Sequence, residues 1–297
     1  MPGPLGVEFA NFPFVYCLLA TAVFVIICVQ ICHLAGKAFS EKFVSIILWV
    51  NFALHFLKQL NPFYAAEWPY ALARSTGENL CAVLVIAEPF LWKWGGKYAK
   101  DYMYYMGIIS TLVILIYPTS LVGIDLHSLD GVLECFRFYS CHAPLLIVAI
   151  VMVREGFHKL NYHRLWAMPL MFCFVQAIIF FNGLFLNLTL YHQSWLEFID
   201  VENKYFNSSF TMGPGHILDP VLGWLYPYLP PILMTYRYAG EIRFVPVVYL
   251  FIPVSLLTAL LGPAFAYPFD YLRFKSDWAL LKQKRRLRKA SGGHLWK

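Results

Sequence analysis

Residues 75–87 read Ser-Thr-Gly-Glu-Asn-Leu-Cys-Ala-Val-Leu-Val-Ile-Ala and change from polar to apolar at Leu80. A polar, turn-prone run that leads directly into apolar residues is typical of the start of a membrane helix. On a helical period of 3.6 residues, Glu78, Cys81 and Glu88 share one face. Because ionisable groups in membrane segments usually face a protein-lined cavity rather than lipid, we expect this face to be wet or buried.

The composition of the whole chain agrees with this interpretation. Of 297 residues, 60% are hydrophobic and only 13% are charged, with a mean hydropathy of +0.59. A soluble globular surface cannot be built from so few polar side chains, which predicts an all-α, polytopic membrane protein. The sequence has no internal repeat or hydrophilic linker, so we predict one transmembrane domain over residues 1–271 and a basic cytoplasmic tail over residues 272–297.

Seven apolar runs are long enough, or nearly long enough, to cross a membrane. They cover residues 14–34, 43–57, 80–94, 103–122, 133–153, 165–190 and 244–267. Lysine and arginine are concentrated in alternate loops and in the tail, and basic residues prefer the cytoplasmic side. This pattern predicts about seven transmembrane helices, with the N-terminus outside and the C-terminus in the cytoplasm.

Two segments have more than one interpretation. Residues 221–236 are apolar but contain three prolines, so we expect an interfacial or re-entrant piece with Trp224 and Tyr228 at headgroup depth, while a spanning helix is the alternative. Residues 282–289 are strongly basic. They either hold the tail against anionic lipid or simply set the topology, and nothing in their pattern indicates a nucleic-acid partner.

The seven cysteines lie in or beside apolar runs and are odd in number, so the sequence does not predict a disulfide framework. No cofactor is indicated, and the scattered histidines do not form a metal site. Most free cysteines pack as small hydrophobic residues. Cys81 follows Glu78 and Asn79 at the start of a membrane segment, and this unusual position leads us to predict that it is a nucleophile.

A second polar group of residues opens the run that begins near residue 133. Glu134 and Arg137 are spaced for an ion pair, and Cys141 shares their helix face. His142 follows, and a histidine there is either a structural hydrogen-bonding residue or a base. Since a thiol needs a base to form a thiolate, and both segments enter from the outside, we predict that His142 activates Cys81. Asn79, Arg137 or a backbone amide would then stabilise an oxyanion.

These motifs together resemble the YwaF-like integral membrane proteins. The match consists of Asn-Leu-Cys-Ala at residues 79–82, Phe-Arg-Phe at 136–138 and Cys-His-Ala at 141–143. Looser similarities are His55 and Lys58, Asn182, and Ile-Leu-Asp at residues 217–219. The family has a eukaryotic branch of transmembrane acyltransferases that move fatty acyl chains between phospholipids through a cysteine and a histidine.

The resemblance implies roles for particular residues of this chain. Cys81 would be the acyl acceptor and His142 the base, with Asn182 and Asp219 as supporting or substrate-binding residues. The chain departs from the family pattern at Asn79, where the family has a second histidine. It also departs at Glu78, Cys141 and Ala143, where the family has Leu, Ser and Gly.

Three classes of function follow from the sequence. The first is a thiol-dependent phospholipid acyltransferase or transacylase whose partners are membrane phospholipids. The second is a lipid or small-molecule transporter or scramblase that uses Glu78, Glu88 and Arg137 along a path. The third is a seven-helix receptor or scaffold. The acyl donor, the acceptor, the organelle and the oligomeric state are left open, with the endoplasmic reticulum or plasma membrane expected in a eukaryote and the cell membrane in a bacterium.

Overall fold

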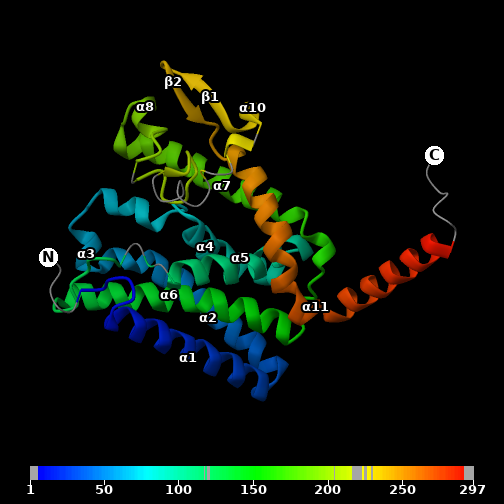
Figure 1. Ribbon diagram of the computed structural model, residues 1–297. Helices are drawn as coiled ribbons and strands as arrows, with labels where there is room; N and C mark the ends of the chain where they lie inside the picture. The colour runs from blue at the N-terminus through cyan, green and yellow to red at the C-terminus, as the bar shows by residue number, and fades with distance from the viewer. Residues whose placement is uncertain are drawn as a thin grey trace.

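The computed structural model describes residues 6–116, 118, 121–203, 205–215, 223, 226–228 and 230–290. It confirms the prediction of an all-α, multi-pass membrane protein (Figure 1). Six helices among the described residues are long and apolar enough to cross a membrane. They are α1 (Phe12–Ala35), α2 (Lys37–Leu57), α5 (Lys97–Ile116), α6 (Leu129–Arg154), α7 (Ala167–Leu186) and α11 (Phe251–Ala290).

The third predicted span forms α4 (Leu80–Trp94), with the bounds expected from its apolar run. With 15 residues, α4 is shorter than each of the six candidate spans. At a rise of about 1.5 Å per residue it is also shorter than the roughly 30 Å hydrocarbon core. The predicted count of seven spans and the orientation therefore remain predictions.

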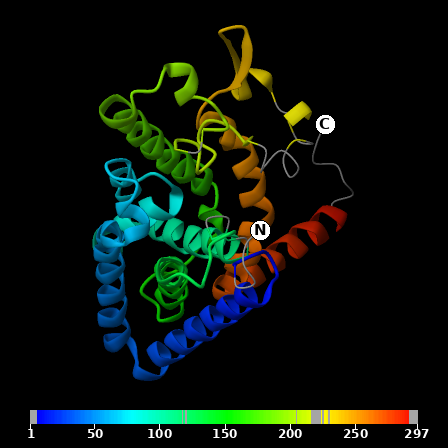
Figure 2. The same ribbon diagram turned by 90° about the vertical axis from the view of Figure 1, so that its left-hand side faces the viewer.

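Helix α6 lies at the centre of the bundle and packs against α1, α2 and α5. Figure 2 shows it end-on in green, with these three helices around it. Gly107 of α5 permits the close approach of α5 to α6, because a Cβ at this position would lie 2.9 Å from the Leu145 carbonyl oxygen. The resulting core is the most buried part of the molecule, and it holds the middle of α6 in a fixed position.

The chain between α2 and α4 folds back over the bundle instead of leaving it. This segment contains the 3₁₀ turns η1 (Lys58–Leu60) and η2 (Tyr70–Ser75) and the short helix α3 (Pro62–Ala65). Helix α3 packs on α6, where the Tyr64 hydroxyl donates a 2.8 Å hydrogen bond to Glu134. Residues 58–79 therefore bring polar side chains against the first half of α6.

The region after α7 contains a structure that the apolar runs did not predict. Strands β1 (Thr235–Tyr238) and β2 (Glu241–Phe244) form an antiparallel hairpin, in which Thr235 pairs with Phe244. The hairpin lies far from α1 (Figures 1 and 2). Within residues 221–236, the described part contains the turn η5 (Tyr226–Tyr228), the short helix α10 (Pro231–Met234) and the start of β1, while Trp224 lies outside the described residues.

Four short elements remain among the described residues, one before α7 and three after it. They are the π-helical turn η4 (Asn187–Tyr191), α8 (Trp195–Phe198) and the 3₁₀ turns η3 (Tyr162–Arg164) and η6 (Val248–Leu250).

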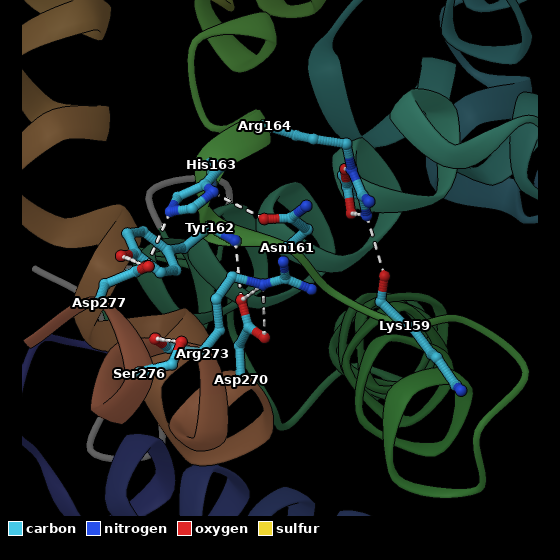
Figure 3. A network of polar contacts seen from close by, with 10 residues as sticks. Lys159, Asn161, Tyr162, His163, Arg164, Asp270, Arg273, Ser276 and Asp277 are labelled. Carbon is cyan, nitrogen blue, oxygen red and sulfur yellow. Dashed lines mark hydrogen bonds and ion pairs between the residues drawn. The ribbon is translucent and has the colours of Figure 1, made fainter. Parts of the chain in front are cut away.

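Helix α11 is broken at Asp270, where φ is −123°, and its second half projects away from the bundle (Figures 1 and 2). The break is held by polar contacts from the α6–α7 connection (Figure 3). The Tyr162 amide donates to the Asp270 carboxylate at 3.0 Å, and Arg273 donates to it at 3.2 Å. Asp277 accepts from His163 at 2.8 Å and from the Tyr162 hydroxyl. That last hydrogen bond raises the pKa of Tyr162 to about 12. The segment predicted as a separate basic tail thus continues as a helix to Ala290.

Candidate functional site

Cys81 lies in the first turn of α4, and the cap of that helix fixes its position. Asn79 has an extended backbone, with φ −149° and ψ 170°, and its side-chain oxygen accepts from the Ala82 amide at 2.9 Å. This is the geometry of an N-cap residue. The Cys81 thiol therefore sits in the first turn of the helix, at the positive end of the helix dipole.

The same cap corrects one sequence interpretation. Because Asn79 is extended, the helix begins at Leu80, and Glu78 does not share a continuous helical face with Cys81 and Glu88. Glu78 instead pairs with Arg74 at 3.3 Å, and burial raises the pKa of its carboxyl group. Glu88 is fully buried, and neither carboxyl oxygen has a hydrogen-bond partner among the described residues.

A loop distant in sequence holds the start of α4 from the other side. The Leu80 amide donates to the Ser209 hydroxyl at 2.9 Å, and the Ser208 hydroxyl donates to the Glu78 carbonyl at 3.1 Å. Gln176 of α7 in turn donates to the Ser209 carbonyl at 2.9 Å. These bonds connect the first turn of α4, through residues 208–209, to the buried face of α7.

His142 lies near the middle of α6, further along the helix than the entrance where the sequence placed the polar group. Its Nδ1 is 2.7 Å from the Phe138 carbonyl oxygen. A carbonyl only accepts, so Nδ1 carries the hydrogen, and in the neutral ring Nε2 is the basic nitrogen. The buried imidazole also has the Cys81 thiol among its neighbours. The fold therefore brings the two residues predicted to act together close to one another, although 60 residues separate them in the chain.

A second thiol, that of Cys141, lies beside the same ring. Its sulfur is 3.4 Å from His142 Nδ1 and 3.9 Å from an Arg137 nitrogen. The Cys141 carbonyl accepts from the Asn51 side chain of α2 at 3.0 Å. Pro144 lies inside α6 and has no amide hydrogen, so the Ser140 carbonyl lacks its usual helical hydrogen bond. The Asn51 bond is made at the next carbonyl along the helix. Asn51 thus ties α2 to α6 next to the ring.

Glu134 and Arg137 form the ion pair expected from their spacing. Arg137 Nε donates to Glu134 Oε2 at 2.7 Å, and a second guanidinium nitrogen donates to Oε1. The guanidinium carbon lies 5.3 Å from the centre of the Tyr64 ring. Arg137 is therefore held by Glu134 and directed toward Cys141, and its recorded contacts do not include Cys81.

The other predicted supporting residues lie in different surroundings. The Asn182 side chain of α7 donates to the Thr76 hydroxyl at 2.8 Å, so it positions the segment that precedes α4. Asp219 lies outside the described residues. Within the described ranges, there is no group of three or more His, Cys, Asp or Glu side chains that could hold a metal ion.

The comparison with protein families gives a match to the TMEM164 family over residues 9–230, which is more than half of the chain. The chain belongs to the TMEM164 family. The match includes Cys81, His142 and every other predicted site residue, and it supports the multi-pass membrane assignment. Neither curated proteins nor solved structures give a match.

This TMEM164 family member also contains site neighbours that sequence reasoning did not identify. The Tyr102 hydroxyl of α5 is buried, has no hydrogen-bond partner among the described residues, and interacts electrostatically with Cys81. Asn51 and Ser209 contact the site from α2 and from the loop after α8. Nothing in the local pattern of these residues distinguishes them from packing residues, because their proximity to the site arises only from the tertiary fold.

Proposed function

We propose that this protein is a thiol-dependent acyltransferase that acts on the acyl chains of membrane phospholipids. Cys81 would be the nucleophile and His142 the base. The observation that carries the proposal is the proximity of the His142 ring to the Cys81 thiol, together with the Phe138 carbonyl that fixes the ring tautomer. A nucleophile next to a base that is oriented by a third group is the usual arrangement for covalent catalysis.

In the proposed reaction, His142 Nε2 takes the thiol proton as the Cys81 sulfur attacks the ester carbonyl carbon of a phospholipid. The carbon–sulfur bond forms and the ester carbon–oxygen bond breaks. The leaving alkoxide of the lysolipid takes the proton from His142, which leaves a neutral imidazole and an acyl thioester on Cys81. A hydroxyl group of an acceptor lipid then gives its proton to His142 and attacks the thioester, which restores the thiol.

The oxyanion formed in both steps requires hydrogen-bond donors. The Cys81 backbone amide makes no hydrogen bond with any described residue and lies in the first turn of α4. Asn79 uses its side-chain oxygen in the cap, and Arg137 is paired with Glu134. Of the three candidates from the sequence, we therefore favour a backbone amide, with the positive end of the α4 dipole adding to the stabilisation.

The choice of a lipid substrate is supported by two features. The helices around the site carry the composition of membrane spans, and many of their large apolar side chains are exposed. The motifs around Cys81 and His142 also resemble those of the YwaF-like family, whose eukaryotic branch transfers acyl chains. A transport path through Glu78 and Arg137 is less well supported, because each of these residues has an ionic partner.

The proposal is tested by acyl exchange between defined phospholipids in proteoliposomes. Cys81→Ala should abolish exchange, because the covalent route is lost. Cys173→Ala is the matched control, since Cys173 is another half-buried free thiol. We expect the control to retain exchange. Equal exchange by wild type and Cys81→Ala, both folded to the same extent, would reject Cys81 as the nucleophile.

A further inference from the structure

A pocket of about 240 Å³ lies between the end of α2 and the first half of α6. Lys58, Arg137 and Cys141 contribute to its lining. Its lining also includes Leu57 and Phe136, which are strongly exposed at 54% and 73%. The pocket thus combines cationic groups with an apolar rim on the outer surface of the helices.

Lys58 is the central feature of this pocket. Only 9% of the residue is exposed, yet its side-chain ammonium makes no hydrogen bond or ion pair with any described residue. The ammonium nitrogen lies over the face of the Tyr64 ring, 5.8 Å from the ring centre. A buried ammonium without a carboxylate partner is costly, so it points to an anion that the pocket is built to receive.

The neighbouring carboxylates form their ion pairs with other cations than Lys58. Glu134 is paired with Arg137, and Glu78 is paired with Arg74, so neither forms an ion pair with the Lys58 ammonium. His55 also lines the pocket, and its buried Nε2 has no hydrogen-bond partner among the described residues. The pocket therefore offers the Lys58 cation to a ligand, beside the His55 ring.

We infer that this pocket binds the phosphate group of a membrane phospholipid. The Lys58 ammonium would donate to the phosphate oxygens, and the exposed rim residues Leu57 and Phe136 would contact the lipid chains. An apolar rim suits a lipid better than a free phosphate ion, which is strongly hydrated on all sides. A lipid phosphate and a free phosphate ion would both accept hydrogen bonds from the Lys58 ammonium. Competition between the two ligands is therefore needed to distinguish them.

The position of the pocket gives the bound lipid a role. Cys141 lines the pocket, and its sulfur lies 3.4 Å from the ring of His142, which has Cys81 as a neighbour. A phospholipid held by its phosphate would therefore lie next to the proposed catalytic pair. The role of the bound phospholipid as a substrate rests on the proposed function. The binding of its phosphate group by the pocket does not depend on thiol chemistry.

The test measures binding of a fluorescent dialkyl phosphatidylcholine to the purified full-length chain in detergent. The dialkyl lipid has no ester to cleave, so binding is separated from turnover. Lys58→Met should weaken binding at least about tenfold, which is the loss expected for one charged hydrogen bond. Lys58→Arg keeps the positive charge and should retain most of the binding. Lys42→Met, which removes an exposed lysine from the other end of α2, is the matched control and should bind like wild type.

Further variants keep the test decisive if Lys58→Met folds poorly. Ser140→Asp introduces a carboxylate into the pocket lining, so it should abolish binding without lowering thermal stability. Cys81→Ser should bind like wild type, and if it loses acyl exchange but keeps binding, the two proposals are separated.

Competition identifies the ligand. Dialkylglycerol, which lacks the phosphate, should not displace the probe, and inorganic phosphate should displace it only at far higher concentration than unlabelled dialkyl phosphatidylcholine. Unchanged binding by both Lys58→Met and Ser140→Asp would overturn the inference. Equal displacement by dialkylglycerol, or by inorganic phosphate at the lipid's own concentration, would also overturn it.

Discussion

The proximity of His142 to Cys81 predicts how fast the thiol reacts with a neutral alkylating agent. A positioned general base typically accelerates a reaction by about 10²–10⁴-fold. Removal of His142 should therefore slow the reaction of the thiol by at least about one order of magnitude. The Phe138 carbonyl leaves Nε2 as the basic nitrogen of the neutral ring, so a single substitution should remove the effect.

His142→Ala should therefore slow alkylation of Cys81 at pH 7 by about one order of magnitude or more, because the base that takes the thiol proton is removed. His142→Gln should preserve side-chain volume but not the reactivity. The assay is a time course with a small membrane-permeant maleimide, followed by peptide mass spectrometry. Cys173 provides an internal control in the same molecule, because its rate should not change. Identical Cys81 rates and pH profiles in all three proteins would refute the proposed pair.

Three further predictions concern the framework of the site. Asn79→Ala removes the α4 cap and should lower the free energy of unfolding by about 1 kcal/mol, with slower Cys81 alkylation; an unchanged alkylation rate would contradict the role of the helix start. Gly107→Val should destabilise by about 1–3 kcal/mol in denaturant unfolding, because its Cβ meets the Leu145 carbonyl at 2.9 Å, and a neutral result would refute the close approach. Asp270→Ala should lower the free energy of unfolding by about 1–3 kcal/mol, because the Tyr162 amide loses its hydrogen-bond partner, and it should speed trypsin cleavage after residue 270. An unchanged cleavage rate would show that these contacts do not hold the break in α11.

The membrane helices could be predicted from sequence because lipid imposes long apolar runs, and residues 80–94 form a helix with the predicted bounds. The lengths of these helices could not be predicted, because polar residues at the ends, such as Lys37 and Lys97, continue the helices beyond their apolar parts. The hairpin at residues 235–244 was missed because each strand has only four residues. Its sequence shows no long alternating pattern.

The candidate site was partly predictable for a different reason. Cys81 and His142 each stand in an unusual local sequence, and the predicted topology placed the entrances of their segments on the same side, so their proximity could be expected. The unpaired state of Lys58 could not be expected, because it depends on Arg74 and Arg137 taking the nearby carboxylates. The role of Asn79 as a helix cap also became clear only from its backbone geometry.

If Cys81 carries an acyl group during the reaction, mass spectrometry of the protein detects this group directly. Protein is incubated in vesicles with a phospholipid that has one isotopically labelled acyl chain, and is then quenched in acid and digested. The peptide that contains Cys81 should gain the mass of the labelled acyl group, neutral hydroxylamine should remove it, and no other cysteine peptide should be labelled. Acyl exchange without any label on Cys81, or with the thioester on Cys141 instead, would show that Cys81 is not the acyl acceptor.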